Sequence, residues 1–78
     1  MKTRREIIEQ YYVNVSDIHT LLRIPRAKAR ELFMEVDREE REKPFRAHNN
    51  KVPLPRILNL ADVNLGFLMK QIRMEDEQ

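Results

Sequence analysis

The chain has 78 residues and a formal net charge of +2 at pH 7, and it contains no cysteine. This length suits one small domain with a limited core, and the lack of cysteine excludes disulfides and thiolate zinc sites. No apolar run approaches the roughly 20 residues that span a bilayer, and acids interrupt the first residues where a secretion signal would be apolar. We therefore expect a cytoplasmic protein that does not enter a membrane.

The first elements are expected to be a helix and a short extended segment. Thr3 suits the cap of a helix over residues 3–11, because Glu6 follows three positions later as a capping-box partner. Apolar residues then recur at helical spacing. The β-prone residues 12–15 predict a short extended segment after this helix.

Residues 16–41 predict two helices joined by a tight turn. Ser16 suits the N-cap of the first helix, and Pro25 suits the first position of the second, which needs no N–H. The first helix must end near Arg23, because the residue before a proline avoids helical geometry. The apolar face of the second helix consists of Ala29, Leu32, Phe33 and Val36.

Residues 44–55 predict a small hairpin, or wing. Asn49 and Asn50 would form its turn, because asparagine tolerates the positive φ that a tight hairpin turn requires. A C-terminal helix is expected over residues 56–73, followed by a frayed tail over 74–78.

Within this segment, Asn59 is a suitable cap for the final helix. Its core-facing stripe would consist of Leu60, Val63, Phe67 and Ile72. Another side of the helix could supply a dimer surface from Leu65, Leu68 and Met69. We expect the aromatic side chains to lie in the core, because base stacking would need an exposed aromatic sheet face. These aromatic residues are Tyr11, Tyr12, Phe33, Phe45 and Phe67.

The expected order of elements is helix, short strand, helix, tight turn, helix, hairpin, helix. This order indicates a mainly α fold with a small β-hairpin, arranged as a winged helix-turn-helix in a single domain over residues 1–78. The alternative is a generic helical domain with a loop in place of the wing.

Residues 12–33 resemble the start of excisionase-like and MerR-like winged helix-turn-helix DNA-binding domains of phages and mobile elements. The residues that match the family's pattern are Tyr12, Val15, Asp17, Leu21, Leu22, Ile24, Arg26, Leu32 and Phe33. Residues 51–56 look like the second wing strand running into the family's last helix. The chain departs from the pattern at Arg23, where glycine is usual, at His19, where a small alanine normally packs, and at Pro25, which replaces a serine cap.

The resemblance implies a recognition helix that lies in the major groove of double-stranded DNA. The residues expected to reach base edges are Arg26, Ala27, Lys28 and Arg30. The residues expected to contact the DNA backbone, or to do so from the wing, are Arg23, Arg46, His48, Asn49, Asn50 and Lys51. The charge pattern agrees, because residues 23–30 hold four basic side chains and no acid. The alternative is that scattered charge only solvates a small domain.

No residue pattern indicates an enzyme, a cofactor or a metal. The two histidines, His19 and His48, fall on different elements without further ligands nearby, and we expect His19 to be a partly buried packing residue. A single glycine leaves no glycine-rich phosphate loop. The carboxylates of residues 35–42 alternate with basic side chains, which is typical of a solvated, ion-paired helix face.

The leading hypothesis is sequence-specific binding of double-stranded DNA by a small phage or mobile-element protein, which binds and bends DNA to direct site-specific recombination. Its partners would be DNA, a recombinase or another protein, and further copies of itself as a homodimer or a cooperative multimer. One alternative is a small transcriptional regulator of the same fold. Another is a protein-interaction adaptor or inhibitor that uses the charged helix at 35–43 and the last helix.

Overall fold

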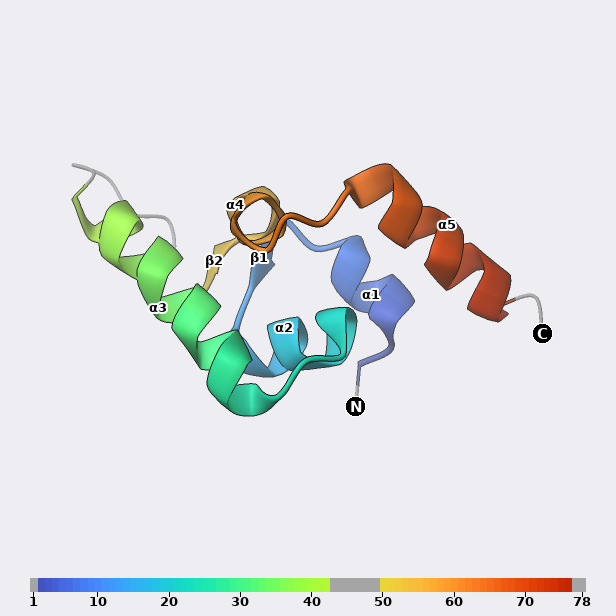
Figure 1. The fold of residues 1–78 in the computed structure, drawn as a ribbon, viewed down its shortest axis with the longest axis horizontal. Coiled ribbons are helices and arrows are strands. Elements are labelled where there is room, and N and C mark those ends of the chain that lie inside the picture. The colour runs from blue at the N-terminus through green and yellow to red at the C-terminus, as the bar shows by residue number, and fades with distance from the viewer. Residues whose placement is uncertain (1, 43–49, 77–78) are drawn as a thin grey trace.

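The computed structural model describes residues 2–42 and 50–76. Their elements, in chain order, are α1 (Arg4–Ile8), β1 (Tyr12–Val13), α2 (Val15–Leu22), α3 (Arg26–Arg41), β2 (Val52–Pro53), α4 (Leu54–Leu60) and α5 (Leu65–Asp76). This part of the chain is therefore mainly helical, with one small antiparallel sheet. The molecule is 44 Å long and about half as wide. The end of α3 and the end of α5 lie at its two extremes, with α1, α2, α4 and the sheet between them (Figure 1).

Helix α1 begins as the sequence predicts but is shorter. Thr3 and Glu6 form the expected capping box. The helix ends at Ile8 and does not reach residue 11, because the chain must extend there to join the sheet. At residue 11 the chain already pairs with a distant segment, because the carbonyl of Tyr11 accepts a hydrogen bond from the Leu54 N–H at 2.7 Å.

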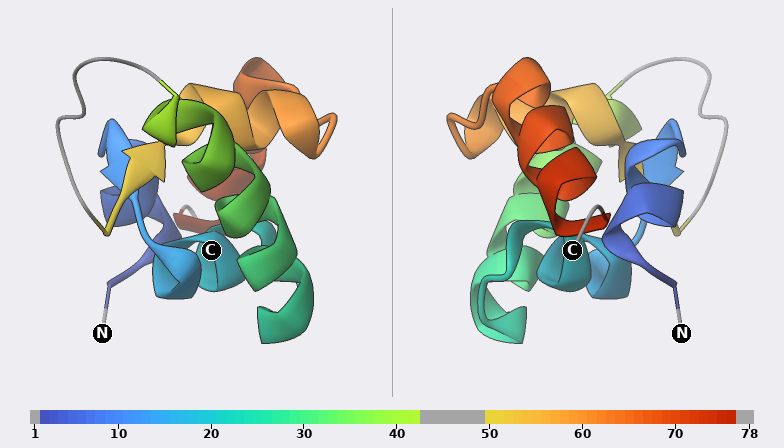
Figure 2. Two further views of the ribbon diagram at one scale, coloured as in Figure 1. Left: turned by 90° about the vertical axis from the view of Figure 1, so that its left-hand side faces the viewer. Right: turned by 90° about the vertical axis from the view of Figure 1, so that its right-hand side faces the viewer.

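The two strands join distant parts of the chain. Tyr12 lies opposite Pro53, and Val13 lies opposite Val52 (Figure 2, left view). The second strand of the expected 44–55 hairpin thus exists as β2, but its partner in the described structure is β1. The expected first strand lies in residues 43–49, which are outside the described residues.

Helices α2 and α3 are joined by a turn of three residues, Arg23, Ile24 and Pro25. Helix α2 begins two residues earlier than a Ser16 cap implies, because Asn14 and not Ser16 is its N-cap. The Asn14 side chain accepts from the Asp17 N–H at 2.8 Å. Pro25 lies at the N-cap position of α3, so the helix itself begins one residue later than expected.

The expected single helix over residues 56–73 is wrong, because the structure divides this segment into α4 and α5. Asp62 adopts left-handed geometry at φ 58°, which ends the helical path. The Asn64 side chain then accepts from the Phe67 N–H at 2.9 Å and caps α5, whereas Asn59 lies inside α4. Helix α5 also continues through Asp76, so residues 74–76 are helical and not a frayed tail.

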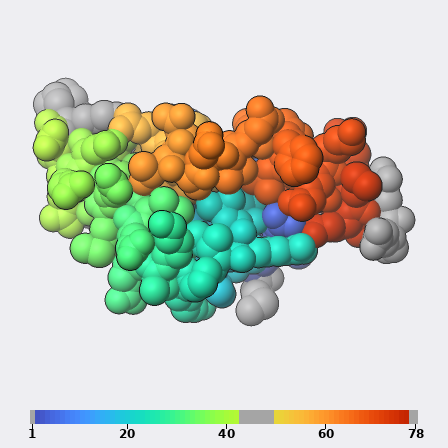
Figure 3. Space-filling view, viewed as in Figure 1, coloured from blue at the N-terminus to red at the C-terminus, as the bar shows by residue number. Residues whose placement is uncertain are grey.

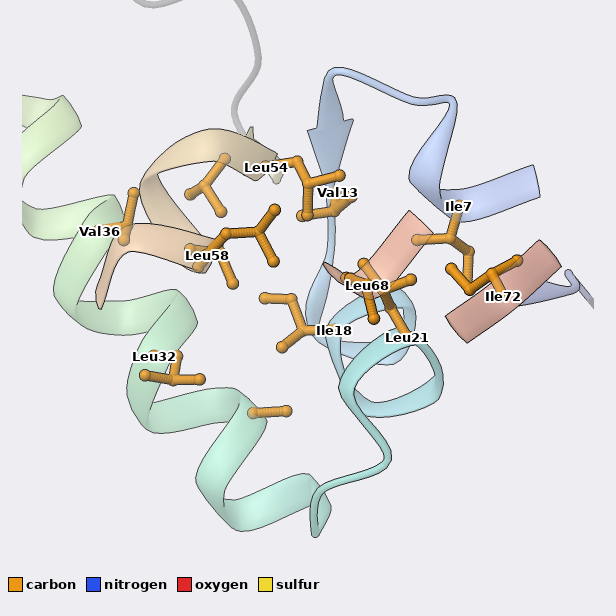
Figure 4. Packing of buried hydrophobic residues seen from close by; sticks show 13 residues of the cluster. Ile7, Val13, Ile18, Leu21, Leu32, Val36, Leu54, Leu58, Leu68 and Ile72 are labelled. Carbon is orange, nitrogen blue, oxygen red and sulfur yellow. The ribbon is translucent and has the colours of Figure 1, made fainter. Parts of the chain in front are cut away.

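The core gathers side chains from every described element (Figure 4). Its buried hydrophobic residues are Ile7, Val13, Ile18, Leu21, Ala29, Leu32, Val36, Val52, Leu54, Ile57, Leu58, Leu68 and Ile72. The expected face of α3 is therefore confirmed, with Phe33 partly buried beside it. The expected stripe of the last helix is wrong at Leu60 and Phe67, which are 40% and 69% exposed. Tyr11 is also exposed and not in the core.

Candidate nucleic-acid interface

The turn before α3 is held by its own side chains. Arg23 adopts the left-handed conformation that glycine usually supplies, at φ 54° and ψ 44°. His19 is partly buried, as expected, and its Nδ1–H donates to the Ile24 carbonyl at 2.6 Å. This bond ties the last turn of α2 to the residue before Pro25. The start of α3 is thereby fixed relative to α2, the helix against which it packs.

The first turns of α3 present the four predicted base-contact residues to solvent. Arg26, Ala27, Lys28 and Arg30 are all exposed. Ala29, which is completely buried, anchors the opposite side of the helix in the core. Exposure of a helix's first turns, with the inner face fixed by packing, is the arrangement that a recognition helix requires.

The basic side chains of this segment divide between two flanks. Arg26 and Arg30 are four positions apart and share one side of the helix, whereas Lys28 is two positions from each and cannot face them. Lys28 Nζ lies 3.7 Å from a carboxylate oxygen of Glu31, three residues further along the helix. Among the described residues, neither Arg26 nor Arg30 has an acidic partner.

Arg23 has an unexpected partner. Its Nη2 forms an ion pair with a Glu75 carboxylate oxygen, although 62% of the Arg23 side chain remains exposed. The sequence predicts Arg23 to contact a DNA phosphate, and the structure places an acid from α5 at that position. No local sequence signal identifies Glu75 as the partner of Arg23, because 52 positions of chain separate the two residues. The sequence also predicts that the acidic tail is frayed.

The described part of the expected wing is limited to its second half. Asn50 and Lys51 are exposed and lead directly into β2, which contacts α3. Arg46, His48 and Asn49 lie outside the described residues. The structure thus brings Lys51 into the neighbourhood of α3 but does not test the wing tip.

A groove of about 650 Å³ separates the start of α3 from α5. The residues that line it are Arg4, Leu22, Ile24, Lys28, Leu32, Leu60, Ala61, Asp62, Val63, Asn64, Phe67, Leu68 and Gln71. On the face shown in Figure 3, the cyan atoms that precede α3 extend to the red C-terminal helix. The recognition-helix candidate is therefore bordered by α5 on its Lys28 flank.

Apart from Glu31, the acids of α3 lie in its second half, and several of them form ion pairs. Asp37 lies 3.0 Å from Arg41 Nε, and Glu39 forms an ion pair with Arg56 of α4. The ion pairing predicted for residues 35–42 is confirmed, but the face is not fully solvated, because Asp37 and Glu40 are each only 9% exposed. Within residues 2–42 and 50–76 we find no cluster of three or more side chains placed to hold a metal ion. The same residues include no helix long and apolar enough to cross a bilayer.

Comparison of the chain with models of protein families, with curated proteins and with solved structures found no significant match.

Proposed function

We propose that this protein is a winged helix-turn-helix protein that binds double-stranded DNA through the first turns of α3. The single observation that carries the proposal is the pair Arg26 and Arg30. Both guanidinium groups are exposed, they share one flank of a helix whose other side is fixed in the core, and neither has an acidic partner among the described residues. In the second half of α3, by contrast, Arg38 lies beside Glu35 and Arg41 lies beside Asp37.

The chemistry of this flank suits the major groove. An arginine can donate two hydrogen bonds to O6 and N7 of guanine, which is worth about 1–3 kcal/mol of discrimination against another base. Ala27 is small and exposed beside them, so it can contact a thymine methyl group. Lys51 and Asn50 precede β2 and would contact the backbone as part of the wing.

The biological role that we propose is that of an excisionase-like protein of a phage or mobile element, which binds and bends DNA so that a recombinase acts in one direction. A transcriptional regulator of the same fold would use the same surface. Deletion of the coding sequence separates these roles: an excisionase-like role predicts loss of excision of an element, whereas a regulator predicts altered expression of a neighbouring gene.

Self-association is part of this proposal, because a single module makes few DNA contacts. The sequence predicts Leu68 as part of a dimer surface, but this prediction is wrong, because Leu68 lies in the core and is only 4% exposed. The exposed apolar residues of α5 are Leu65, Phe67, Met69 and Met74. Four such side chains offer far less than the about 800 Å² that each partner contributes to a stable interface. We therefore expect copies to associate weakly in solution and cooperatively on DNA.

The test is DNA binding across a salt series, measured by fluorescence anisotropy with mixed-sequence duplex DNA. The proposal predicts that log affinity falls linearly with log salt concentration. The triple variant Arg26→Ala/Lys28→Ala/Arg30→Ala should bind much more weakly, with a smaller salt slope. For a comparison at equal charge, the double variant Arg26→Ala/Arg30→Ala is matched by Arg38→Ala/Arg41→Ala, which removes two cations from the far half of the same helix and should change binding little.

Absence of binding by the wild-type protein near 50 mM salt would refute the proposal, because the phosphate term alone should give roughly micromolar affinity there. Equal losses in the two double variants would also refute it, since net charge alone would then explain the binding. An adaptor or inhibitor function predicts that the triple variant stays fully active in the cell.

A further inference from the structure

One carboxylate joins three segments that are far apart in the sequence. Arg4 Nη1 donates to both Glu75 oxygens, at 2.7 and 3.0 Å, and Arg23 Nη2 forms an ion pair with one of them. Arg4 belongs to α1, Arg23 to the turn before α3, and Glu75 to the last turn of α5. Two guanidinium groups therefore converge on a single anion.

The cationic side of this cluster is built into the fold. Only 11% of the Arg4 side chain is exposed, and its Nε donates to the Leu21 carbonyl at 2.9 Å. That carbonyl belongs to the last turn of α2 and has no helical partner of its own. Arg4 is thus fixed to the end of α2 by a bond that does not involve α5. It would stay in place if the Glu75 carboxylate left.

The anionic side comes from α5, a different element from those that hold the two arginines. Helix α5 packs against α1, and its Gln71 accepts a bond from Arg4 Nη2 at 3.3 Å. A single acid against two guanidinium groups leaves one positive charge uncompensated. A phosphate oxygen is an acceptor of the same charge and satisfies the same donors as a carboxylate.

The cluster lies beside the proposed DNA-binding surface. Arg23 is three residues before Arg26, and Arg4 lines the same groove as Lys28. An anion held there by Arg23 would therefore be next to the start of the recognition helix. This is where helix-turn-helix proteins contact the phosphates that flank their base contacts.

We propose that Arg4 and Arg23 form a phosphate-binding site that the chain's own Glu75 occupies, so that α5 competes with DNA for this site. The inference rests on the proposed function where the phosphate is that of DNA, and it stands independently where the phosphate is inorganic. In the free protein Arg4 and Arg23 share the single negative charge of Glu75. Displacement of the Glu75 carboxylate adds a phosphate contact to those of α3.

The test compares Glu75→Gln with Asp76→Asn in the salt-series binding assay. Both changes remove one acid from the same turn of α5, but Asp76 pairs with Arg5 at 3.2 Å, away from the site. Glu75→Gln should steepen the salt slope by about 0.9 and raise the affinity roughly 5- to 10-fold near 0.1 M salt, the effect of one more phosphate contact. Asp76→Asn should change neither. In Arg23→Ala/Glu75→Gln the gain should disappear.

Equal behaviour of Glu75→Gln and Asp76→Asn, in a wild-type protein that binds DNA, would overturn this inference and leave the proposed function intact. If neither the wild-type protein nor Glu75→Gln binds DNA, the proposed function fails. The phosphate site is then tested by titration with inorganic phosphate. Saturable shifts of the Arg4 and Arg23 Nε resonances in Glu75→Gln, at phosphate concentrations that leave Asp76→Asn unchanged, would support the site. Their absence would overturn it.

Circular dichroism establishes that each variant is folded. If Glu75→Gln unfolds, the wild-type protein provides the measurement instead. Rising inorganic phosphate should then shift the side-chain carboxyl resonance of Glu75 and leave that of Asp76 unchanged. A Glu75 resonance that does not respond to phosphate would contradict the inference.

Discussion

The left-handed backbone of Arg23 makes a prediction whose sign can be tested. A residue with a Cβ atom in this conformation costs about 1–2 kcal/mol relative to an ordinary helical one, and glycine avoids that cost. Glycine also has about 0.5–1 kcal/mol more backbone entropy to lose on folding. Arg23→Gly should therefore be roughly 0.5–1 kcal/mol more stable than Arg23→Ala. Both variants lose the Glu75 ion pair, so its contribution cancels in the comparison.

Arg30 supplies the matched control, because it is exposed within a regular helix. There, Arg30→Gly should be about 1 kcal/mol less stable than Arg30→Ala. The assay is urea unfolding followed by circular dichroism. In thermal unfolding each 1 kcal/mol corresponds to about 4–8 °C for a domain of this size. If the glycine variant is less stable than the alanine variant at both positions, Arg23 does not adopt the left-handed conformation. The geometry described for the turn before α3 would then be wrong.

Three further predictions concern the caps, the core and the surface of α5. In urea unfolding, Asn14→Ala should destabilise the fold by about 1 kcal/mol, and Ser16→Ala by less than about 0.5 kcal/mol. A larger loss in Ser16→Ala than in Asn14→Ala would contradict the capping box at Asn14. Ile18→Ala should cost about 2–5 kcal/mol, because the side chain is completely buried, and a cost below about 1 kcal/mol would show that α2 packs differently. Phe67→Ser and Met74→Ser should each change the free energy of unfolding by less than about 0.5 kcal/mol. Each should reduce the cooperativity of binding to tandem DNA sites. Unchanged cooperativity would exclude α5 as the contact between copies.

The α2–α3 unit could be predicted closely because its signals are local. A proline restricts the residue before it, and apolar residues at helical spacing define the buried face. The end of α3 at Arg41 and the burial of Ala29, Leu32 and Val36 agree with that reading. The capping residue was misassigned because Asn14 and Ser16 are equally suitable by type, and only the register of the capping box with Asp17 distinguishes them.

The C-terminal half was harder to predict because its determinants are not local. The break at Asp62 depends on a left-handed residue that is not glycine, and asparagine occurs at both Asn59 and Asn64, of which only the second caps a helix. If the last helix is assumed to be capped by Asn59 and not by Asn64, its apolar stripe is predicted on the wrong side of α5. That assumption placed Phe67 in the core, whereas Leu68 is the buried residue.

Contacts between distant segments explain the remaining differences. The pairing of β1 with β2 joins residues about 40 positions apart, and a local hairpin is the simpler expectation for an asparagine pair followed by a β-prone segment. The partner of Arg23 could not be predicted either, because Glu75 reaches it only after α5 folds back along α1. Exposure of Arg26 and Arg30 follows from their helical spacing alone, which is why the candidate base-contact residues were identifiable from sequence.

The most direct test of the central claim is the location of DNA on the protein surface. Backbone amide resonances of isotope-labelled protein, followed as duplex DNA is added at low salt, report that location residue by residue. The account predicts that the largest shifts fall within residues 23–31, with small shifts in the second half of α3. Largest shifts on the exposed apolar face of α5, or no shifts at all, would contradict the claim that α3 binds DNA.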